Sequence, residues 1–355
     1  MISNIRTSLK HYKLGTQILH AFSRMTLYTA LVYDSPGPPE AVLQLRNLES
    51  PGALSEEEVR VKFLKAPINP SDINTIEGKY PLAPNLPGGV PGHEGVGEII
   101  EVGSQVKNMR VGDWVVPTAP CCGTWRQEVV LPSRNLFSLP PNCIPLEAAA
   151  TLCINPPSAL AMLEDFVQLC PGDVIIQNGA TSAVGKIVIQ LARNMGVKTV
   201  NIIRPRAHWD ETVAELKLLG ADIITTEARA HEDVKAHGIP PAVLGLNCVG
   251  GSSVVAVAKL LRDGGTVVTY GGMSMQPVNI PTSLLIFKNI SFRGFWLSGS
   301  SEGKKLTALS KLIALIQEGA LKPGPTKSFK IGQVKEALEY YKTEHRPSKV
   351  LLNMQ

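Results

Sequence analysis

The chain has 355 residues, enough for two packed domains, and its 44% apolar and 18% charged side chains are typical of an ordered globular protein. No apolar run approaches the roughly 20 residues that cross a bilayer, so we expect a soluble protein without a membrane span. The net charge is +5, but four basic residues near the N-terminus account for most of it. The rest of the chain carries +1 and offers little attraction for nucleic acid.

Those basic residues are Arg6, Lys10, Lys13 and Arg24, and the first carboxylate in the chain is Asp34. A basic, acid-free segment that contains Ser and Thr is typical of a mitochondrial presequence, which the import machinery reads as a positive amphipathic helix. A disordered basic tail is the alternative. We therefore expect residues 1–24 to be a presequence and the protein to work in the mitochondrial matrix.

Six cysteines lie at positions 121, 122, 143, 153, 170 and 248, without a CxxC pair or a repeated spacing. This arrangement fits neither a disulfide framework nor a zinc ribbon. Reduced thiols are the expectation, in keeping with a matrix protein.

From about residue 26 to residue 157 the sequence is rich in Pro and Gly. Short β-type runs occur at residues 59–63, 97–102 and 113–116, and turn signals recur about every ten residues. This pattern of short strands and frequent turns predicts a small antiparallel barrel.

From residue 171 to about residue 296, apolar strands alternate with amphipathic helices. The expected strands are residues 174–177, 199–203, 222–225, 243–248 and 266–270. The expected helices are residues 186–195, 211–219 and 252–262, ended by Gly196, Gly220 and Gly264. Continuous Val/Ile strands separated by helices indicate a parallel sheet covered on both faces.

A further helix is expected at residues 304–316, followed by a β-type tail that ends at residues 349–352. The tail has β-type runs like those of the first region, so we expect it to pack with that region and make the domain discontinuous. The predicted domains are therefore residues 25–157 with 300–355, and residues 158–299.

Residues 177–185 join the first strand of the alternating region to its first helix. Small residues at this turn let the backbone approach a pyrophosphate at a helix N-terminus. Ala183 replaces the central glycine of the GxGxxG motif, so the motif alone is weak. The strand before it and the helix after it favour a dinucleotide-binding loop over an ordinary strand–helix turn.

The second strand of the region runs into Arg204-Pro205-Arg206. Enzymes that bind NADH carry an acidic residue at this point, where a carboxylate would repel a 2′-phosphate. Two guanidinium groups suit a phosphate dianion through forked, charge-assisted hydrogen bonds. We predict NADPH as the cofactor; two solvated arginines at the sheet edge are the alternative.

Six further segments carry a resemblance: GHEGVG (92–97), VGDWVVP (111–117), LNCVGG (246–251), TYGGM (269–273), LLIFK (284–288) and RGFWLS (293–298). With them, the chain from about Leu31 onward resembles the medium-chain dehydrogenase/reductase superfamily, and closely the mitochondrial trans-2-enoyl-CoA reductases. The resemblance implies an α/β fold with a GroES-like β-barrel catalytic domain and a Rossmann, doubly wound parallel sheet. It also implies a homodimer joined through the nucleotide-binding sheets.

The implied activity is NADPH-dependent reduction of trans-2-enoyl thioesters, carried on coenzyme A or acyl carrier protein, in mitochondrial fatty acid synthesis. By motif position, the implied NADPH contacts are Asn155, Thr181, Ser182, Ala183, Val184, Arg204, Pro205, Arg206, Tyr270, Gly271, Gly272, Met273, Phe295, Trp296, Leu297, Ser298 and Lys349. The chain departs from the family pattern in two places. The loop reads Thr181-Ser182-Ala183 where relatives often carry glycine before Val184, and Pro205 separates the two arginines.

The resemblance assigns Tyr80 the role of proton donor or enolate-stabilising hydroxyl. From the residues alone, Tyr80 reads as a half-buried loop tyrosine, Asn155 as a turn residue, and Phe295 with Trp296 as core aromatics. The family match adds that these two aromatics border the cofactor and an apolar channel for the acyl chain.

A catalytic zinc usually takes three protein ligands. His93 and Cys153 lie where zinc-dependent relatives place ligands, but residues 68–72 replace the first-loop cysteine and no four-cysteine lobe is present. We therefore predict a metal-free enzyme in which His93 packs or forms hydrogen bonds. Two rivals stay open: a zinc-free quinone or enone reductase of the same superfamily, and a catalytically silent NADPH-binding protein.

Overall fold

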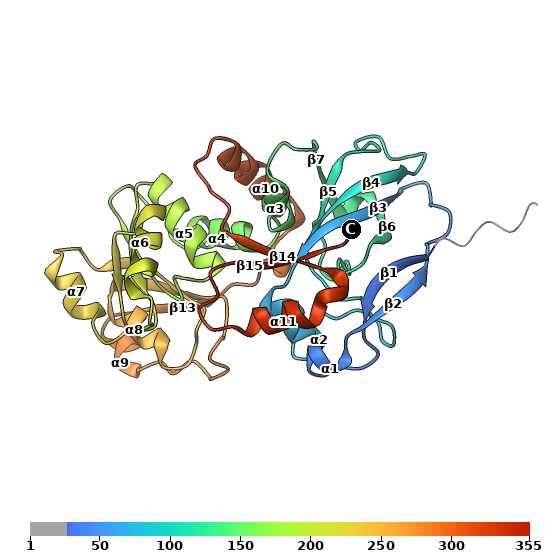
Figure 1. The fold of residues 1–355 in the computed structure, drawn as a ribbon. Coiled ribbons are helices and arrows are strands. Elements are labelled where there is room, and N and C mark those ends of the chain that lie inside the picture. Colours follow the sequence, from blue (N-terminus) through green and yellow to red (C-terminus); the bar gives the residue numbers. More distant parts are fainter. Residues whose placement is uncertain (1–26) are drawn as a thin grey trace, which may run out of the picture.

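A computed structural model describes residues 27–355 (Figure 1). Two large sheets organise these residues, one with six strands and one with seven, beside a ribbon of β1 (Leu27–Val32) and β2 (Gln44–Glu49). The presequence predicted for residues 1–24 lies outside the described residues. Across residues 27–355, no helix is both long and apolar enough to cross a membrane.

The six-stranded sheet is parallel throughout and lies in the order 3-2-1-4-5-6 along the chain, the order of a doubly wound nucleotide-binding fold. Its strands in spatial order are β10 (Ile223–Thr225), β9 (Lys198–Ile202), β8 (Val174–Asn178), β11 (Ala242–Asn247), β12 (Leu261–Thr269) and β13 (Ser291–Gly294). The predicted parallel sheet is confirmed.

Helices cover both faces of this sheet because successive strand residues point to opposite sides. Ile175 packs in one core with Val188, whereas Ile176 packs in another with Val257. The helices are α5 (Ala183–Asn194), α6 (Trp209–Leu219), α7 (Ala230–Ala236), α8 (Ser253–Lys259) and α9 (Thr282–Ile286). This sheet and these helices are called the six-stranded half below.

The seven-stranded sheet is built mainly from the first part of the chain. Its strands are β14 (Thr326–Lys330), β15 (Lys349–Asn353), β3 (Glu58–Pro67), β4 (Val96–Val102), β5 (Trp114–Pro117) and β7 (Leu136–Leu139), with β6 (Glu128–Pro132) paired to β3. β15 runs antiparallel to β3, with Leu351 opposite Pro67. The C-terminal tail thus returns to the first region, as Figure 1 shows where the red strands meet the blue ones.

This sheet, with β1, β2, α1 (Pro39–Val42), α2 (Pro70–Ile76), α3 (Leu146–Ala150) and α11 (Val334–Lys342), is called the seven-stranded half. Val350 and Leu352 of the tail share its core with Phe63 and Trp125. The tail therefore contributes to the packing of this half rather than merely lying against it. The domain limits themselves stay a prediction.

Two helices lie between the halves: α4 (Asn155–Glu164) packs against α5 on one side and α10 (Glu302–Gln317) on the other. One continuous hydrophobic core joins the two halves. Trp114 and Leu139 of the seven-stranded half belong to it, as do Ile175 and Leu246 of the six-stranded half.

One predicted helix end is wrong. The helix expected at residues 252–262 ends at Lys259 in α8, because β12 begins two residues later at Leu261, which pairs with Ala242. Gly264 is consequently not a helix stop but lies within β12, with a φ of +72° that glycine adopts at little cost. Gly196 and Gly220 do follow α5 and α6 as predicted.

Candidate active site

The loop from β8 to α5 is shaped for an anion at the helix N-terminus. Ser182 is the N-cap of α5, and its Oγ accepts a hydrogen bond from the Gly185 N–H at 3.1 Å. A Cβ on Gly185 would lie 2.7 Å from the Ala180 backbone, so only glycine lets the loop fold this closely onto the first turn. The exposed N–H groups and the dipole of this twelve-residue helix favour a negatively charged group here.

A buried hydroxyl without a partner lies beside this loop. Tyr270 directly follows β12, and its Oη, near the Cys248 thiol and the Ser182 side chain, makes no hydrogen bond of good geometry among residues 27–355. Burial, together with the neighbouring Cys248 thiol, raises the pKa of Tyr270 well above its ordinary value, so the phenol keeps its proton. Leaving such a donor unsatisfied costs about 1–3 kcal/mol. The residues present therefore fit a bound dinucleotide that supplies the missing acceptor.

At the crevice between β8 and β11, where the strand order reverses, buried asparagines hold the strand ends together. Asn178 Nδ2 donates to Asn247 Oδ1 at 2.8 Å, and the Cys248 N–H donates to Asn178 Oδ1 at 2.8 Å. Ligands of doubly wound sheets bind outside this reversal. Sequence reasoning did not single out Asn178, because a lone asparagine at a strand end carries no distinctive signal.

Arg204 and Arg206 follow β9 and form no ion pair with any carboxylate in the part of the chain that the structure describes. Arg206 Nη2 donates to Thr181 Oγ1 at 3.3 Å, which brings its guanidinium to the dinucleotide loop. Burial and the charge of Arg204 lower the pKa of Arg206. Two adjacent cations without a counter-ion form a fitting place for a phosphate dianion.

Tyr80 and Trp296 meet across the junction of the two halves. Tyr80 lies in the loop after α2, Trp296 follows β13, and Trp296 Nε1 donates a hydrogen bond to Tyr80 Oη at 2.7 Å. An indole N–H only donates, so the phenol oxygen is the acceptor in this contact. The phenol proton of Tyr80 therefore remains available for a second acceptor.

His93 packs edge-on against Tyr80, with ring centroids 5.5 Å apart. Its Nδ1 accepts from the Cys121 N–H at 3.2 Å, which places the ring proton on Nε2, 2.8 Å from Thr75 Oγ1. The prediction of a packing and hydrogen-bonding histidine is confirmed. The His93 ring, fixed at both nitrogens, packs against one side of the Tyr80 phenol.

Beneath these rings lies a network of buried charges. Glu94 is fully buried: its Oε1 accepts from the backbone N–H groups of Cys153 and Ile154 at 2.7 and 2.8 Å, and its Oε2 accepts from Asn69 Nδ2 at 2.9 Å. Asn69 Oδ1 in turn accepts from Lys349 Nζ. The network thus fixes the start of α4, where predicted residue Asn155 lies buried, relative to Lys349 on β15.

Asp72 adds a second buried carboxylate to the network, bound by the backbone N–H groups of Asn69 at 2.8 Å and His93 at 2.9 Å. Burial raises the pKa of Asp72 and of Glu94, and burial lowers the pKa of Lys349, whereas the opposite charges counter both effects. Sequence reasoning assigned no role to Asp72 or Glu94. The only available signal was that Glu94 belongs to the GHEGVG segment.

Most of the other predicted residues lie in the loops that follow β12 and β13. Gly271, Gly272 and Met273 follow Tyr270 in the loop after β12, where the Met273 side chain is 61% exposed. Phe295 packs edge-on against Phe166 with centroids 6.0 Å apart. Leu297 and Ser298 lie in a short 3-10 helix, Leu297–Gly299, directly after Trp296. An apolar acyl channel beside Phe295 and Trp296 stays a prediction.

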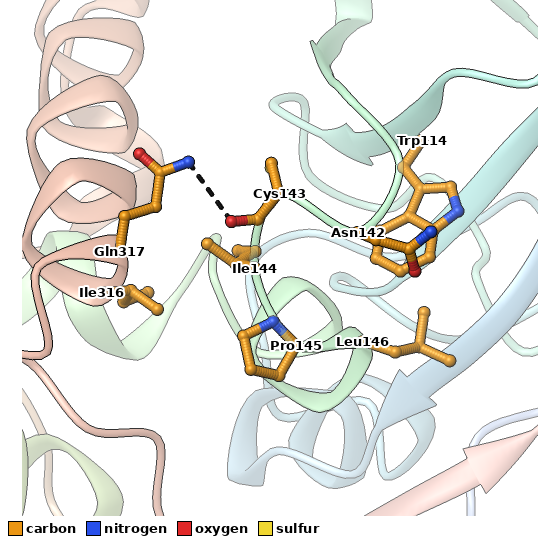
Figure 2. A pocket seen from close by; sticks show the side chains of 8 residues that line it. All are labelled: Trp114, Asn142, Cys143, Ile144, Pro145, Leu146, Ile316 and Gln317. Atoms are coloured by element: carbon orange, nitrogen blue, oxygen red, sulfur yellow. Dashed lines mark hydrogen bonds between the residues drawn. The ribbon is translucent and has the colours of Figure 1, made fainter.

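A cavity of about 440 Å³ lies elsewhere, between the end of α10 and the loop before α3 (Figure 2). Figure 2 shows the Gln317 side chain donating to the Cys143 carbonyl oxygen across its rim, at 3.2 Å. The lining residues are Trp114, Asn142, Cys143, Ile144, Pro145, Leu146, Ile316 and Gln317. None of them is a predicted site residue, so the chemistry described above does not involve this cavity.

Burial keeps the thiols near His93 in the protonated form. Burial raises the pKa of Cys121 and of Cys122 to about 11, and raises the pKa of Cys153 well above its ordinary value. Metal binding requires the thiolate form. Across residues 27–355, no group of three or more His, Cys, Asp and Glu side chains is arranged to hold a metal ion. That the enzyme works without a metal stays a prediction.

Comparisons with known proteins agree with this geometry. The family model for the alcohol dehydrogenase GroES-like domain matches residues 55–141, and that for zinc-binding dehydrogenases matches residues 183–313. The mitochondrial enoyl-[acyl-carrier-protein] reductase of Arabidopsis thaliana is 48% identical over 300 residues, which cover 82% of this chain and 79% of that protein. The chain belongs to this reductase family.

Solved structures of the same family are similar over nearly the whole chain. The mitochondrial 2-enoyl thioester reductase Etr1p/Etr2p heterodimer from Candida tropicalis gives a TM-score of 0.85 at 36% identity and covers 93% of this chain and 100% of that one. Etr1p in complex with NADP and crotonyl-CoA gives a TM-score of 0.86, with the same identity and coverage. The predicted family, fold class, kind of enzyme and mitochondrial location are thereby confirmed.

Proposed function

We propose that this reductase transfers hydride from NADPH to trans-2-enoyl thioesters, carried on coenzyme A or acyl carrier protein, in mitochondrial fatty acid synthesis. The observation that carries the proposal is the hydrogen bond from Trp296 Nε1 to Tyr80 Oη. This bond joins the loop after α2, on the seven-stranded half, to the segment after β13, on the six-stranded half. Etr1p, with which the chain shares its fold, was solved with NADP and crotonyl-CoA bound.

The reaction needs a hydride at the β-carbon, support for negative charge on the thioester carbonyl oxygen, and a proton for the α-carbon. When bound, the nicotinamide supplies the hydride. Tyr80 can stabilise the negative charge on the carbonyl oxygen or supply the proton for the α-carbon, because its O–H can donate to an enolate. Conjugation with the thioester already polarises the double bond, so the proposal requires no metal.

The surrounding residues orient this phenol. Trp296 occupies the acceptor side of the Tyr80 oxygen, and the edge of His93 restrains its ring. Holding the donor in one direction before substrate arrives lowers the reorganisation needed during the reaction. We assign Tyr80 as the catalytic residue, with Trp296 positioning it as well as bordering the cofactor.

The cofactor contacts are proposed on both halves. Ser182 and the α5 N-terminus face the pyrophosphate, Arg204 and Arg206 face the 2′-phosphate, and the Tyr270 hydroxyl takes a cofactor acceptor. The remaining residues of the predicted set, up to Lys349 on β15, would line the cleft between these anchor points.

A homodimer is proposed through the outer edge of the six-stranded sheet. β13 is the last strand there and pairs only with β12 among residues 27–355, so its other side offers free backbone groups. Next to it Leu285, Ile286 and Phe287 are 46%, 66% and 79% exposed, an apolar group that water disfavours. A two-fold axis at this edge would join two such sheets and cover both groups.

We also propose domain boundaries between residues 157 and 158 and between residues 299 and 300. Residues 1–24 are proposed to direct import into the mitochondrion.

Steady-state kinetics test the activity directly. With NADPH, the enzyme is expected to turn over enoyl-CoA substrates of several chain lengths with a kcat/KM at least tenfold above that for a simple quinone. With NADH, kcat/KM should fall by about a hundredfold, because the two arginines lose their phosphate. Faster quinone turnover would contradict the substrate assignment. Tight NADPH binding without any turnover would support the silent binding protein instead.

Tyr80→Phe removes only the phenol oxygen. The expected result is a kcat about 10²- to 10³-fold lower, the usual contribution of a positioned proton donor, with NADPH affinity within about twofold of the parent. Stopped-flow kinetics and NADPH fluorescence titration measure the two effects. Tyr340→Phe on α11 is the matched control and should leave kcat unchanged. A near-normal kcat in Tyr80→Phe would refute the catalytic role.

Arg204→Ala combined with Arg206→Ala is expected to weaken NADPH binding by about a hundredfold and NADH binding by less than about threefold, since only NADPH carries the 2′-phosphate. Titration of cofactor fluorescence gives both dissociation constants. Arg229→Ala, which breaks an exposed ion pair with Asp233 on α7, is the control. Equal losses for both cofactors would place the 2′-phosphate elsewhere.

Sedimentation velocity at about 10 μM protein should show a dimer. Ile286→Asp with Phe287→Asp places charges in the apolar group and is expected to give monomers, whereas Leu218→Asp, at an 83% exposed position on α6, should not. A dimer that persists in the double variant would show that another surface joins the subunits.

A further inference from the structure

The last turn of α2 holds the segment that carries Tyr80 at both of its ends. The Lys79 N–H donates to the Asn74 carbonyl oxygen at 2.7 Å. Thr75 Oγ1 donates to the Leu82 carbonyl oxygen at 3.2 Å. Tyr80 lies between these two bonds, directly after the first and two residues before the second. The backbone on either side of the phenol is therefore fixed to a single helix turn.

The Thr75 hydroxyl also receives a hydrogen bond from the His93 ring. The ring proton of His93 is on Nε2, which lies 2.8 Å from Thr75 Oγ1. A hydroxyl can accept one bond while it donates another, so His93 donates to Thr75 and Thr75 donates to Leu82. Thr75 is 2% exposed, so water does not compete for either bond. The hydroxyl thus links the ring that packs against Tyr80 to the segment that carries Tyr80.

A second residue of α2 holds the backbone of the same histidine. Asp72 Oδ1 accepts a hydrogen bond from the His93 N–H at 2.9 Å. Asp72 and Thr75 are three positions apart on α2, and residues at this spacing share one face of a helix. One face of α2 therefore fixes His93 at its backbone and at its ring. Of the two residues, Thr75 is the one that also binds the segment of residues 79–82.

We propose that Thr75 is a positioning residue for the reaction: its hydroxyl couples His93 to residues 79–82 and so sets the direction of the Tyr80 O–H. Trp296 Nε1 donates to Tyr80 Oη at 2.7 Å from the other half, and this bond needs the phenol in one orientation. A proton donor held in this way needs little reorganisation during the reaction. The inference rests on the proposed function.

Thr75→Val keeps the size of the side chain and removes both hydrogen bonds. It is expected to lower kcat for crotonyl-CoA with NADPH about tenfold, because a small misplacement of a reacting group is costly. KM and NADPH affinity should stay within about twofold of the parent, since the proposal gives Thr75 no contact with either ligand. Thr75→Ser retains the hydroxyl and should keep kcat within about threefold of the parent. Stopped-flow kinetics and NADPH fluorescence titration measure these effects.

A double-mutant cycle separates positioning from a general loss of stability. Tyr80→Phe already lacks the phenol oxygen, so Thr75→Val should lower the remaining kcat by less than about twofold in that background. A full tenfold loss there would overturn the proposal, because Thr75 would then act through another group.

Thr199→Val is the matched control. Thr199 is fully buried near the start of β9 and accepts a hydrogen bond from Asn201 Nδ2 at 2.8 Å. Ligands of doubly wound sheets bind at the opposite, carboxyl ends of the strands. The variant loses a buried hydroxyl as Thr75→Val does, but it should leave kcat unchanged.

Hydrogen exchange of the Trp296 indole N–H, followed by NMR, tests the geometry without turnover. Trp296→Phe identifies the signal. Because Tyr80 Oη accepts this proton, Thr75→Val should speed its exchange about tenfold, whereas Thr75→Ser and Thr199→Val should leave the rate within about twofold. An unchanged rate in Thr75→Val would refute the positioning role, whatever happens to kcat.

Two further outcomes are distinguishable. If the parent enzyme did not reduce crotonyl-CoA, the proposed function would fail, and the exchange rate of the Trp296 N–H would still decide the role of Thr75. If Thr75→Val did not fold, Thr75→Cys would replace it, since a thiol is only a weak donor and acceptor. Thr75→Cys should change kcat and the exchange rate in the same directions by smaller factors, and values equal to those of the parent would refute the proposal.

Discussion

The structure depends on a small set of charges that are withdrawn from water together. Glu94 and Asp72 are fully buried, and each is tolerated because backbone N–H groups, Asn69 and Lys349 surround it. Burying an unpaired carboxylate would cost several kcal/mol, so these partners must be present at once. The network ties the first turn of α2, the start of α4 and the C-terminal strand β15, segments that are far apart in the chain.

This constraint shapes the site above it. The His93 backbone is held by Asp72, its ring is fixed by Cys121 and Thr75, and the ring restrains Tyr80. Trp296 reaches Tyr80 from the other half of the molecule. The reacting groups are thus positioned by contacts that form only when both halves are folded and packed through their shared core, which is a form of preorganisation.

The cofactor anchor and the proton donor lie on different halves of the molecule. Arg204 and Arg206, which form no ion pair among the described residues, follow β9, whereas Tyr80 lies in the loop after α2. The thiols around His93 are kept protonated by burial, and we propose that the Tyr80 phenol, with its proton free, takes the electrophilic role.

The sequence by itself determined the alternation of strands and helices, the dinucleotide loop and the arginine pair after β9, because each depends on residues close together in the chain. Periodicity and small residues at one turn are local signals. The helical pattern of residues 252–262 predicted the wrong end for α8, because Leu261 pairs with Ala242 in the sheet. Only the tertiary structure brought Trp296 to Tyr80 and Lys349 to Asn69. Those contacts join residues that are distant in the chain, and their energies depend on burial that no local pattern records.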